Sequence, residues 1–98
     1  MSREYTNKEI VEELIEGIKN SIAYWVDRTD KTNEEIIEGA THSVLCIFDG
    51  ITSLPAFNIS VSPHPDDKQY NIDNGDNYYP ENKIINDDIY MHDLVFKR

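Results

Sequence analysis

Residues 6–28 have the sequence TNKEIVEELIEGIKNSIAYWVDR, which combines a helix start signal with a continuous apolar stripe. Thr6 and Glu9 fit a capping box, in which the hydroxyl accepts from the backbone N–H three residues on and the glutamate reaches back. Apolar side chains then recur at helical spacing. They are Val11, Leu14, Ile15, Ile18, Ile22, Trp25 and Val26. The sequence therefore predicts an amphipathic helix over residues 6–28.

A second helix is predicted over residues 32–50. Thr32 and Glu35 repeat the capping-box pattern. Apolar residues again follow at helical spacing, namely Ile36, Ile37, Ala40, Val44, Ile47, Phe48 and Ile51. Leu45 and Cys46 make the opposite side apolar as well in the last two turns. We therefore expect the C-terminal half of this helix to lie between the first helix and another layer.

The second half of the chain predicts that layer to be β-structure. Strands are expected over residues 56–62, 68–73 and 76–79. Apolar and polar residues alternate in the first of them, and Asn74-Gly75 is a strong signal for a two-residue hairpin turn. Residues 86–97 fit either a short helix or a final strand. The predicted fold class is α+β, a single domain with two N-terminal helices packed on a small, mainly antiparallel sheet of two to four strands.

Charge excludes several functional classes. The 98 residues include 9 Lys and Arg against 19 Asp and Glu, a formal net charge of −10. Nucleic-acid binding and docking on anionic lipid both need a basic surface, so we expect neither. The longest apolar run, Val44 to Phe48, is too short to cross a bilayer. With no apolar segment at the N-terminus, a soluble cytoplasmic protein is predicted.

Each of the three histidines has an acidic neighbour in sequence or along a helix face. The groups are His42 with Glu38 and Asp49, His64 with Asp66 and Asp67, and His92 with Asp93. Imidazole and carboxylate together suit a divalent metal, but these spacings match no established metal-binding signature. In a chain this acidic, such neighbours also arise by chance. We therefore expect no metal and no cofactor, with a small metal-dependent hydrolase using His42, Asp49, His64 or His92 as the alternative.

The one cysteine, Cys46, excludes an internal disulfide. It lies between His42 and Asp49 on one helical face, so a thiolate activated by the imidazole is one interpretation. Its neighbours form the apolar run Val-Leu-Cys-Ile-Phe, in which a cysteine behaves as a small buried hydrophobe. We therefore predict no catalytic residue.

The distribution of acids and tyrosines points to a binding surface. From His64 to Asp93 there are eight acids and only two lysines, with four tyrosines among them. Tyrosine offers contact area at low entropic cost, and surrounding carboxylates would steer a basic partner. The predicted partner-binding residues are Tyr78, Tyr79, Asp66, Asp67, Asp73, Asp76 and Glu81.

The element Tyr78-Tyr79-Pro80-Glu81 resembles the Tyr-Tyr-Pro element of colicin-type nuclease immunity proteins. In that family, the tyrosine pair and neighbouring acids grip a basic nuclease. The resemblance covers four residues. It concerns the binding surface and not the fold, because that family is a bundle of four short helices, whereas strands are predicted here. The predicted function is a small, acidic, non-enzymatic protein of inhibitor or immunity type that covers a basic surface of a partner such as a nuclease. The alternatives are the metal-dependent hydrolase and a housekeeping homodimer.

Overall fold

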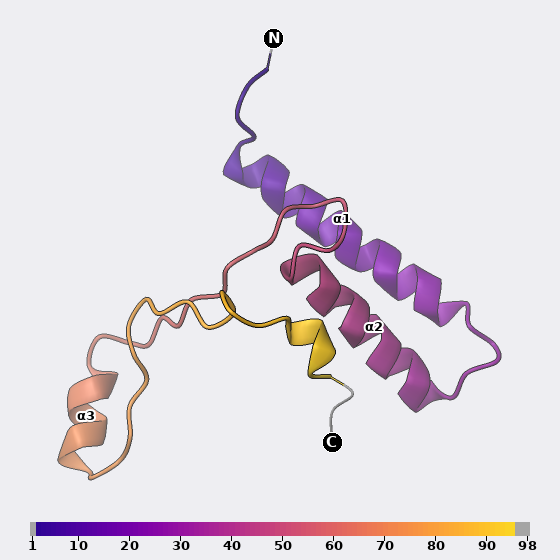
Figure 1. Ribbon diagram of the computed structural model, residues 1–98. Helices are drawn as coiled ribbons and strands as arrows, with labels where there is room; N and C mark the ends of the chain where they lie inside the picture. The colour runs from indigo at the N-terminus through magenta and orange to yellow at the C-terminus, as the bar shows by residue number, and fades with distance from the viewer. Residues whose placement is uncertain (1, 96–98) are drawn as a thin grey trace. The chain divides into compact units, whose positions relative to one another are not determined.

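The computed structural model describes residues 2–95, which form three α-helices and one short 3₁₀ helix (Figure 1). The elements are α1 (Asn7–Val26), α2 (Asn33–Phe48), α3 (Asp67–Asp73) and the 3₁₀ helix η1 (Met91–Asp93). Contacts divide these residues into two compact units, one made of 2–57 with 90–95 and the other of Asn58–Ile89. Within the same range, no helix combines the length and apolarity needed to cross a membrane.

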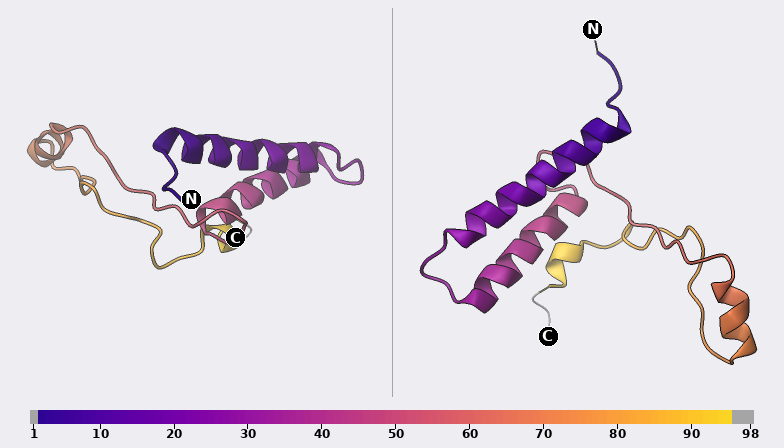
Figure 2. Two further views of the ribbon diagram at one scale, coloured as in Figure 1. Left: turned by 90° about the horizontal axis from the view of Figure 1, so that it is seen from above. Right: turned by 180° about the vertical axis from the view of Figure 1, so that it is seen from behind.

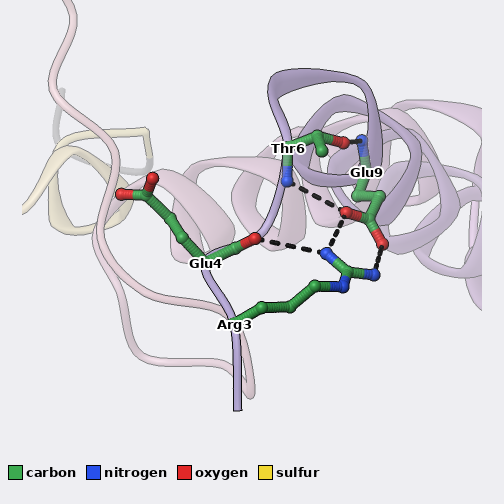
Figure 3. Close-up of polar contacts among 4 residues, drawn as sticks. All are labelled: Arg3, Glu4, Thr6 and Glu9. Atoms are coloured by element: carbon green, nitrogen blue, oxygen red, sulfur yellow. Dashed lines mark hydrogen bonds and ion pairs between the residues drawn. The ribbon is translucent and has the colours of Figure 1, made fainter. Parts of the chain in front are cut away.

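α1 begins at the predicted capping box (Figure 3). The Glu9 N–H donates to the Thr6 hydroxyl at 3.2 Å, and the Thr6 N–H donates to the Glu9 carboxylate at 2.9 Å. The Arg3 guanidinium donates two further hydrogen bonds to that carboxylate, both 2.8 Å long. Arg3 first, and then Thr6, lower the pKa of Glu9 to about 2. The start of α1 is thus held by an arginine in addition to the predicted cap.

α2 begins and ends as its local sequence specifies. Thr32 and Glu35 form the second predicted capping box, with hydrogen bonds of 3.0 and 3.1 Å. At the other end, Gly50 has a φ of 79°, and its N–H donates to the Ile47 carbonyl at 3.2 Å. This left-handed glycine is typical of the Schellman motif that ends many helices. Both predicted capping boxes are therefore confirmed.

α1 and α2 lie side by side in antiparallel directions (Figures 1 and 2). Ile47 is only 3% exposed, and its Cδ1 would lie 3.3 Å from a Cβ added to Gly17. Further along, the Trp25 indole covers Gly39 so closely that an added Cβ would lie 2.6 Å from the ring. The Trp25 Nε1 also donates to the Ser43 hydroxyl at 2.9 Å. The helices therefore approach closely where glycines leave room.

The predicted sheet, and with it the α+β fold class, is wrong. Residues 2–95 contain no strand, and the chain is helical in that range. In the predicted strand 56–62, backbone hydrogen bonds join Ile59 and Val61 to residues 82–85, but the pairing amounts to one isolated antiparallel bridge, Ser60 with Ile84. Residues 76–79 form a loop. Alternation of apolar residues alone is not enough, because a strand needs an extended ladder of hydrogen bonds, and the pairing with residues 82–85 is too short to form one.

The predicted strand 68–73 is instead α3, because local interactions there favour a helix. Asp67 lies in the first turn, where negative charge suits the helix dipole. The Gln69 amide donates to the Asp73 carboxylate, one turn on, at 2.8 Å. This pair at i and i+4 supports a helix and has no equivalent in a strand.

The Asn74-Gly75 pair ends α3 rather than turning a hairpin. A type I′ turn needs positive φ at both positions, whereas Asn74 has a φ of −96° and only Gly75 is positive, at 73°. The Asp76 N–H donates to the Asn71 carbonyl at 2.8 Å, which is the long bond of a Schellman motif. The Asn74-Gly75 pair therefore terminates a helix and does not connect two strands.

A short helix or a strand is predicted over residues 86–97. In the described part, 86–95, only Met91–Asp93 is helical, as η1, and residues 96 and 97 lie outside the description. η1 packs against α2 (Figures 1 and 2). The second side of α2 is therefore covered by this C-terminal segment and not by the expected sheet.

Candidate functional site

The predicted partner-binding residues all belong to the Asn58–Ile89 unit and are exposed. Tyr79 is 74% exposed and Tyr78 is 47% exposed. The Lys68 Nζ lies 5.2 Å from the centre of the Tyr78 ring, within reach of a cation–π contact. The exposed acids are Asp66, Asp67, Asp73, Asp76 and Glu81. The tyrosine pair thus presents its rings to solvent in an acidic unit.

The negative charge of this unit is largely uncompensated. Asn58–Ile89 contains seven acids and two lysines. Among residues 2–95, no lysine or arginine forms an ion pair with any of these acids; Asp66 lies 3.8 Å from the His64 ring. Exposed charges of one sign create a field that acts over about a Debye length, near 8 Å at physiological salt. This field would attract a cationic surface.

The second group of interest lies in the other unit, where the structure gathers three side chains that can bind metal. His42 and Cys46 are one helical turn apart on α2, and His92 comes from η1. One donor atom from each lies within 4.8 Å of the other two. The Cys46 Sγ is 3.8 Å from the His42 Nδ1, and the two imidazole rings meet edge to face at 5.4 Å.

Asp49, the C-cap of α2, holds this cluster together. Its side chain is fully buried and accepts hydrogen bonds from the backbone N–H groups of Met91, at 2.9 Å, and His92, at 2.8 Å. The His92 Nδ1 lies 2.6 Å from the same carboxylate. Burial alone would raise the pKa of the Asp49 carboxyl, but these hydrogen bonds outweigh it and lower the pKa. Asp49 therefore fixes both the start of η1 and the orientation of the His92 ring.

The Cys46 thiol has surroundings that oppose a thiolate. Burial raises the pKa of Cys46, and the nearby carboxylates of Asp49 and Asp93 raise it further. A nucleophilic cysteine needs the opposite setting, with positive charge that lowers its pKa. The geometry therefore gives no support to Cys46 as a nucleophile activated by His42.

The alternative metal set predicted from the sequence is only partly brought together. His42 and Asp49 lie in the first unit with His92, and the Asp49 carboxylate contacts the His92 ring. His64 belongs to the other unit. Sequence reasoning left out Cys46 as a ligand, although its spacing of four residues from His42 places both on one face of a helix.

Two groups of residues therefore stand out, the exposed tyrosines and acids of Asn58–Ile89 and the cluster of His42, Cys46 and His92 beside Asp49. The first group combines exposed aromatic rings with negative charge, and the second brings together side chains that can bind metal. No known protein family, no curated protein and no solved structure matches this chain.

Proposed function

We propose that this chain is a small, non-enzymatic binding protein of inhibitor type, whose Asn58–Ile89 unit covers a basic surface of a protein partner. The observation that carries the proposal is the exposed pair Tyr78 and Tyr79 within a unit whose acids have no lysine or arginine ion-pair partner among residues 2–95. A nuclease, with its cationic nucleic-acid site, is a partner of the right chemistry. We place the encounter in the cytoplasm, where the free thiol of Cys46 would stay reduced.

The acids and the tyrosines have different tasks in this proposal. Exposed carboxylates steer a basic partner and so raise the association rate. Tyrosines gain most when a partner desolvates them, and truncation of such an anchor costs 2 kcal/mol or more, which is about a 30-fold change in affinity. Tyr79 has the most surface to bury, since three-quarters of it is exposed. The acids should thus control how fast the complex forms, and Tyr79 how long it lasts.

The test is a kinetic comparison of variants on the basic protein that the full chain captures from a lysate. The charge variant replaces Asp66, Asp67, Asp73 and Asp76 by Asn. Its matched control replaces four exposed glutamates of the other unit, Glu4, Glu12, Glu13 and Glu16, by Gln, which removes the same charge elsewhere. We expect the Asn variant to associate about 10-fold more slowly at low salt and like the parent at high salt. The Gln control should associate much faster than the Asn variant at low salt.

The tyrosine arm uses Tyr79→Ala with Tyr5→Ala as its control, because Tyr5 is similarly exposed in the other unit. Tyr79→Ala should speed dissociation about 30-fold at every salt concentration, whereas Tyr5→Ala should leave it unchanged. If the Asn variant associates as fast as the Gln control, or if Tyr79→Ala dissociates like Tyr5→Ala, the surface is not where the partner binds.

A specific observation also favours the homodimer alternative. One side of α1 carries four exposed apolar residues within a narrow arc of the helix, Val11, Ile15, Ile22 and Val26. A contiguous apolar stripe on a surface is typical of an interaction site. Sedimentation equilibrium tests whether it joins two copies of the chain. A dimer that Ile15→Lys dissociates and Ile37→Lys leaves intact would support this function, and a monomer at all concentrations would contradict it.

A further inference from the structure

The donor atoms of His42, Cys46 and His92 are spaced almost as a metal ion would require. In tetrahedral zinc sites, Zn–S bonds of about 2.3 Å and Zn–N bonds of about 2.0–2.1 Å place sulfur and nitrogen about 3.6 Å apart. The Cys46 Sγ and His42 Nδ1 are 3.8 Å apart, and the three donor atoms lie within 4.8 Å of one another. Shifts of about 1 Å would therefore close the three side chains around an ion.

We propose that His42, Cys46 and His92 form a site for one Zn²⁺ ion, with an oxygen ligand in the fourth position. This inference is independent of the proposed partner surface, which lies in the other unit. One thiolate and two imidazoles suit zinc, which accepts sulfur and nitrogen together. Magnesium and calcium prefer a shell of oxygen atoms, and this cluster offers too few.

Two features of the fold support the geometry. His42 and Cys46 are held one turn apart on α2, so their side chains leave the same face of a rigid element. His92 is oriented by the buried Asp49 carboxylate, 2.6 Å from its Nδ1, so Nε2 is the nitrogen that would bind the ion. Nε2 lies 3.2 Å from the Asp93 carboxylate, a half-exposed contact that the ion would replace. A carboxylate that binds the second ring nitrogen of a histidine is the usual outer contact of zinc-binding histidines. Asp49 is thus a positioning residue for the site.

The charge of the cluster also suits a divalent cation. With the Cys46 proton released to the buffer on binding, the thiolate and the buried Asp49 carboxylate would carry two negative charges beside two neutral imidazoles, and the more exposed Asp93 carboxylate adds a third. A Zn²⁺ ion would offset the two buried charges. Because partly buried charges need partners, the ion would stabilise an arrangement that includes two anionic groups. It would also tie η1 to α2 through bonds from both elements.

The first experiment titrates Co²⁺, as a spectroscopic substitute for zinc, into the full chain without an affinity tag. We expect a thiolate-to-cobalt charge-transfer band that saturates at one ion per chain and disappears when one equivalent of Zn²⁺ is added. Cys46→Ser should abolish the band. His42→Ala and His92→Ala should each weaken zinc binding at least 10-fold, and the matched control His64→Ala should leave it unchanged.

The second experiment tests the positioning role and does not depend on a ligand substitution. Asp49→Asn retains all three ligands and should weaken zinc binding by about 10–100-fold, the usual effect of losing such an outer contact. In the unmodified chain, Zn²⁺ should slow alkylation of Cys46 at least 10-fold, while Mg²⁺ should have no effect. The alkylation measurement uses the unmodified chain, so it remains valid even if the histidine variants fail to fold.

Three results would overturn the zinc site. One is the absence of a thiolate band together with unchanged alkylation of Cys46 in the presence of Zn²⁺. Another is zinc binding by folded His42→Ala or His92→Ala, checked by circular dichroism, that equals binding by the parent. The third is a His64→Ala variant that loses affinity as much as they do.

Discussion

The His92 Nδ1 lies 2.6 Å from the Asp49 carboxylate, although 43 residues separate the two in the sequence. Asp49 also accepts hydrogen bonds from two successive backbone N–H groups at the start of η1. A single buried side chain at the end of α2 therefore holds the C-terminal segment of the first unit. Several consequences of this arrangement and of the helix pair can be measured.

Asp49→Ala should destabilise the chain by about 3 kcal/mol, because it leaves two backbone donors and an imidazole without their charged acceptor. The matched control is Asp27→Ala. Asp27 is the C-cap of α1, as Asp49 is of α2, but its side chain is exposed. That change should cost no more than about 0.5 kcal/mol. Urea denaturation followed by circular dichroism measures both, and equal midpoints would show that Asp49 holds nothing in place.

Ile47→Ala should destabilise by about 2–5 kcal/mol, since Ile47 is 3% exposed where α2 meets Gly17 of α1. Ile37→Ala is the control, with the same substitution on the same helix at a side chain that is 66% exposed. Its effect should stay within about 0.5 kcal/mol. The prediction fails if the two urea midpoints coincide.

Gly39→Ala should destabilise although alanine favours helix by about 1 kcal/mol over glycine. The added Cβ would lie 2.6 Å from the Trp25 ring, so the indole would have to move and give up its hydrogen bond to Ser43. We expect a loss of about 1–3 kcal/mol, the usual effect of overpacking. Gly17→Ala gains the same helix propensity, but its added Cβ would make a looser contact, 3.3 Å from Ile47. It should therefore destabilise the chain clearly less than Gly39→Ala. The reverse order of thermal midpoints would contradict the observed packing.

The cap of α1 should respond to acid only at low pH. The pKa of Glu9 is lowered to about 2, chiefly by Arg3, from an ordinary value of about 4.3. A lowered pKa in the folded state means that the contribution of Glu9 is complete above about pH 4.3 and is lost as the pH falls through about 2. Arg3→Ala should raise the pKa of Glu9 only part of the way back, because the Thr6 N–H still donates to it. Carbon-13 NMR of the side-chain carboxyl measures this.

Glu35 is the internal control in that titration. It occupies the same place in the second capping box, but no arginine among residues 2–95 contacts its carboxylate, and its pKa is lowered mainly by the backbone N–H of Thr32. Arg3→Ala should leave its titration unchanged. A shift at Glu35 equal to that at Glu9 would mean that the arginine acts on the whole molecule and not through the contact described.

The parts of the fold that the sequence predicts correctly depend on contacts within a few residues. The capping boxes at Thr6 and Thr32 are complete within four residues of sequence, so their chemistry is readable before any tertiary structure is known. The predicted strands are wrong because period-two alternation reports which side of a segment is apolar, and not how far another segment pairs with it. At residues 67–76, the interactions of Asp73 and Gly75 decided in favour of a helix instead.

The candidate metal site shows the same limit more clearly. The sequence places His42, Cys46 and Asp49 on one helical face, because three or four residues make one turn. It cannot place His92 there, since that depends on a chain reversal that spans more than 40 residues. The contact of Asp49 with His92 is likewise beyond the sequence, because proximity along a helix says nothing about a segment that arrives from elsewhere.

The attachment of Asn58–Ile89 to the helix pair has a consequence for how this chain can vary. The Phe57 N–H donates to the Phe48 carbonyl at 2.9 Å, and the Met91 N–H donates to Asp49 at 2.9 Å, so the unit leaves and rejoins the scaffold at one end of α2. It is an insert with two anchored ends. Because halving or doubling a closed loop changes its closure entropy by only about 0.6 kcal/mol, the insert can be shortened, lengthened or exchanged while the scaffold keeps its stability. The length of the insert and the stability of the helix pair are thereby free to vary independently.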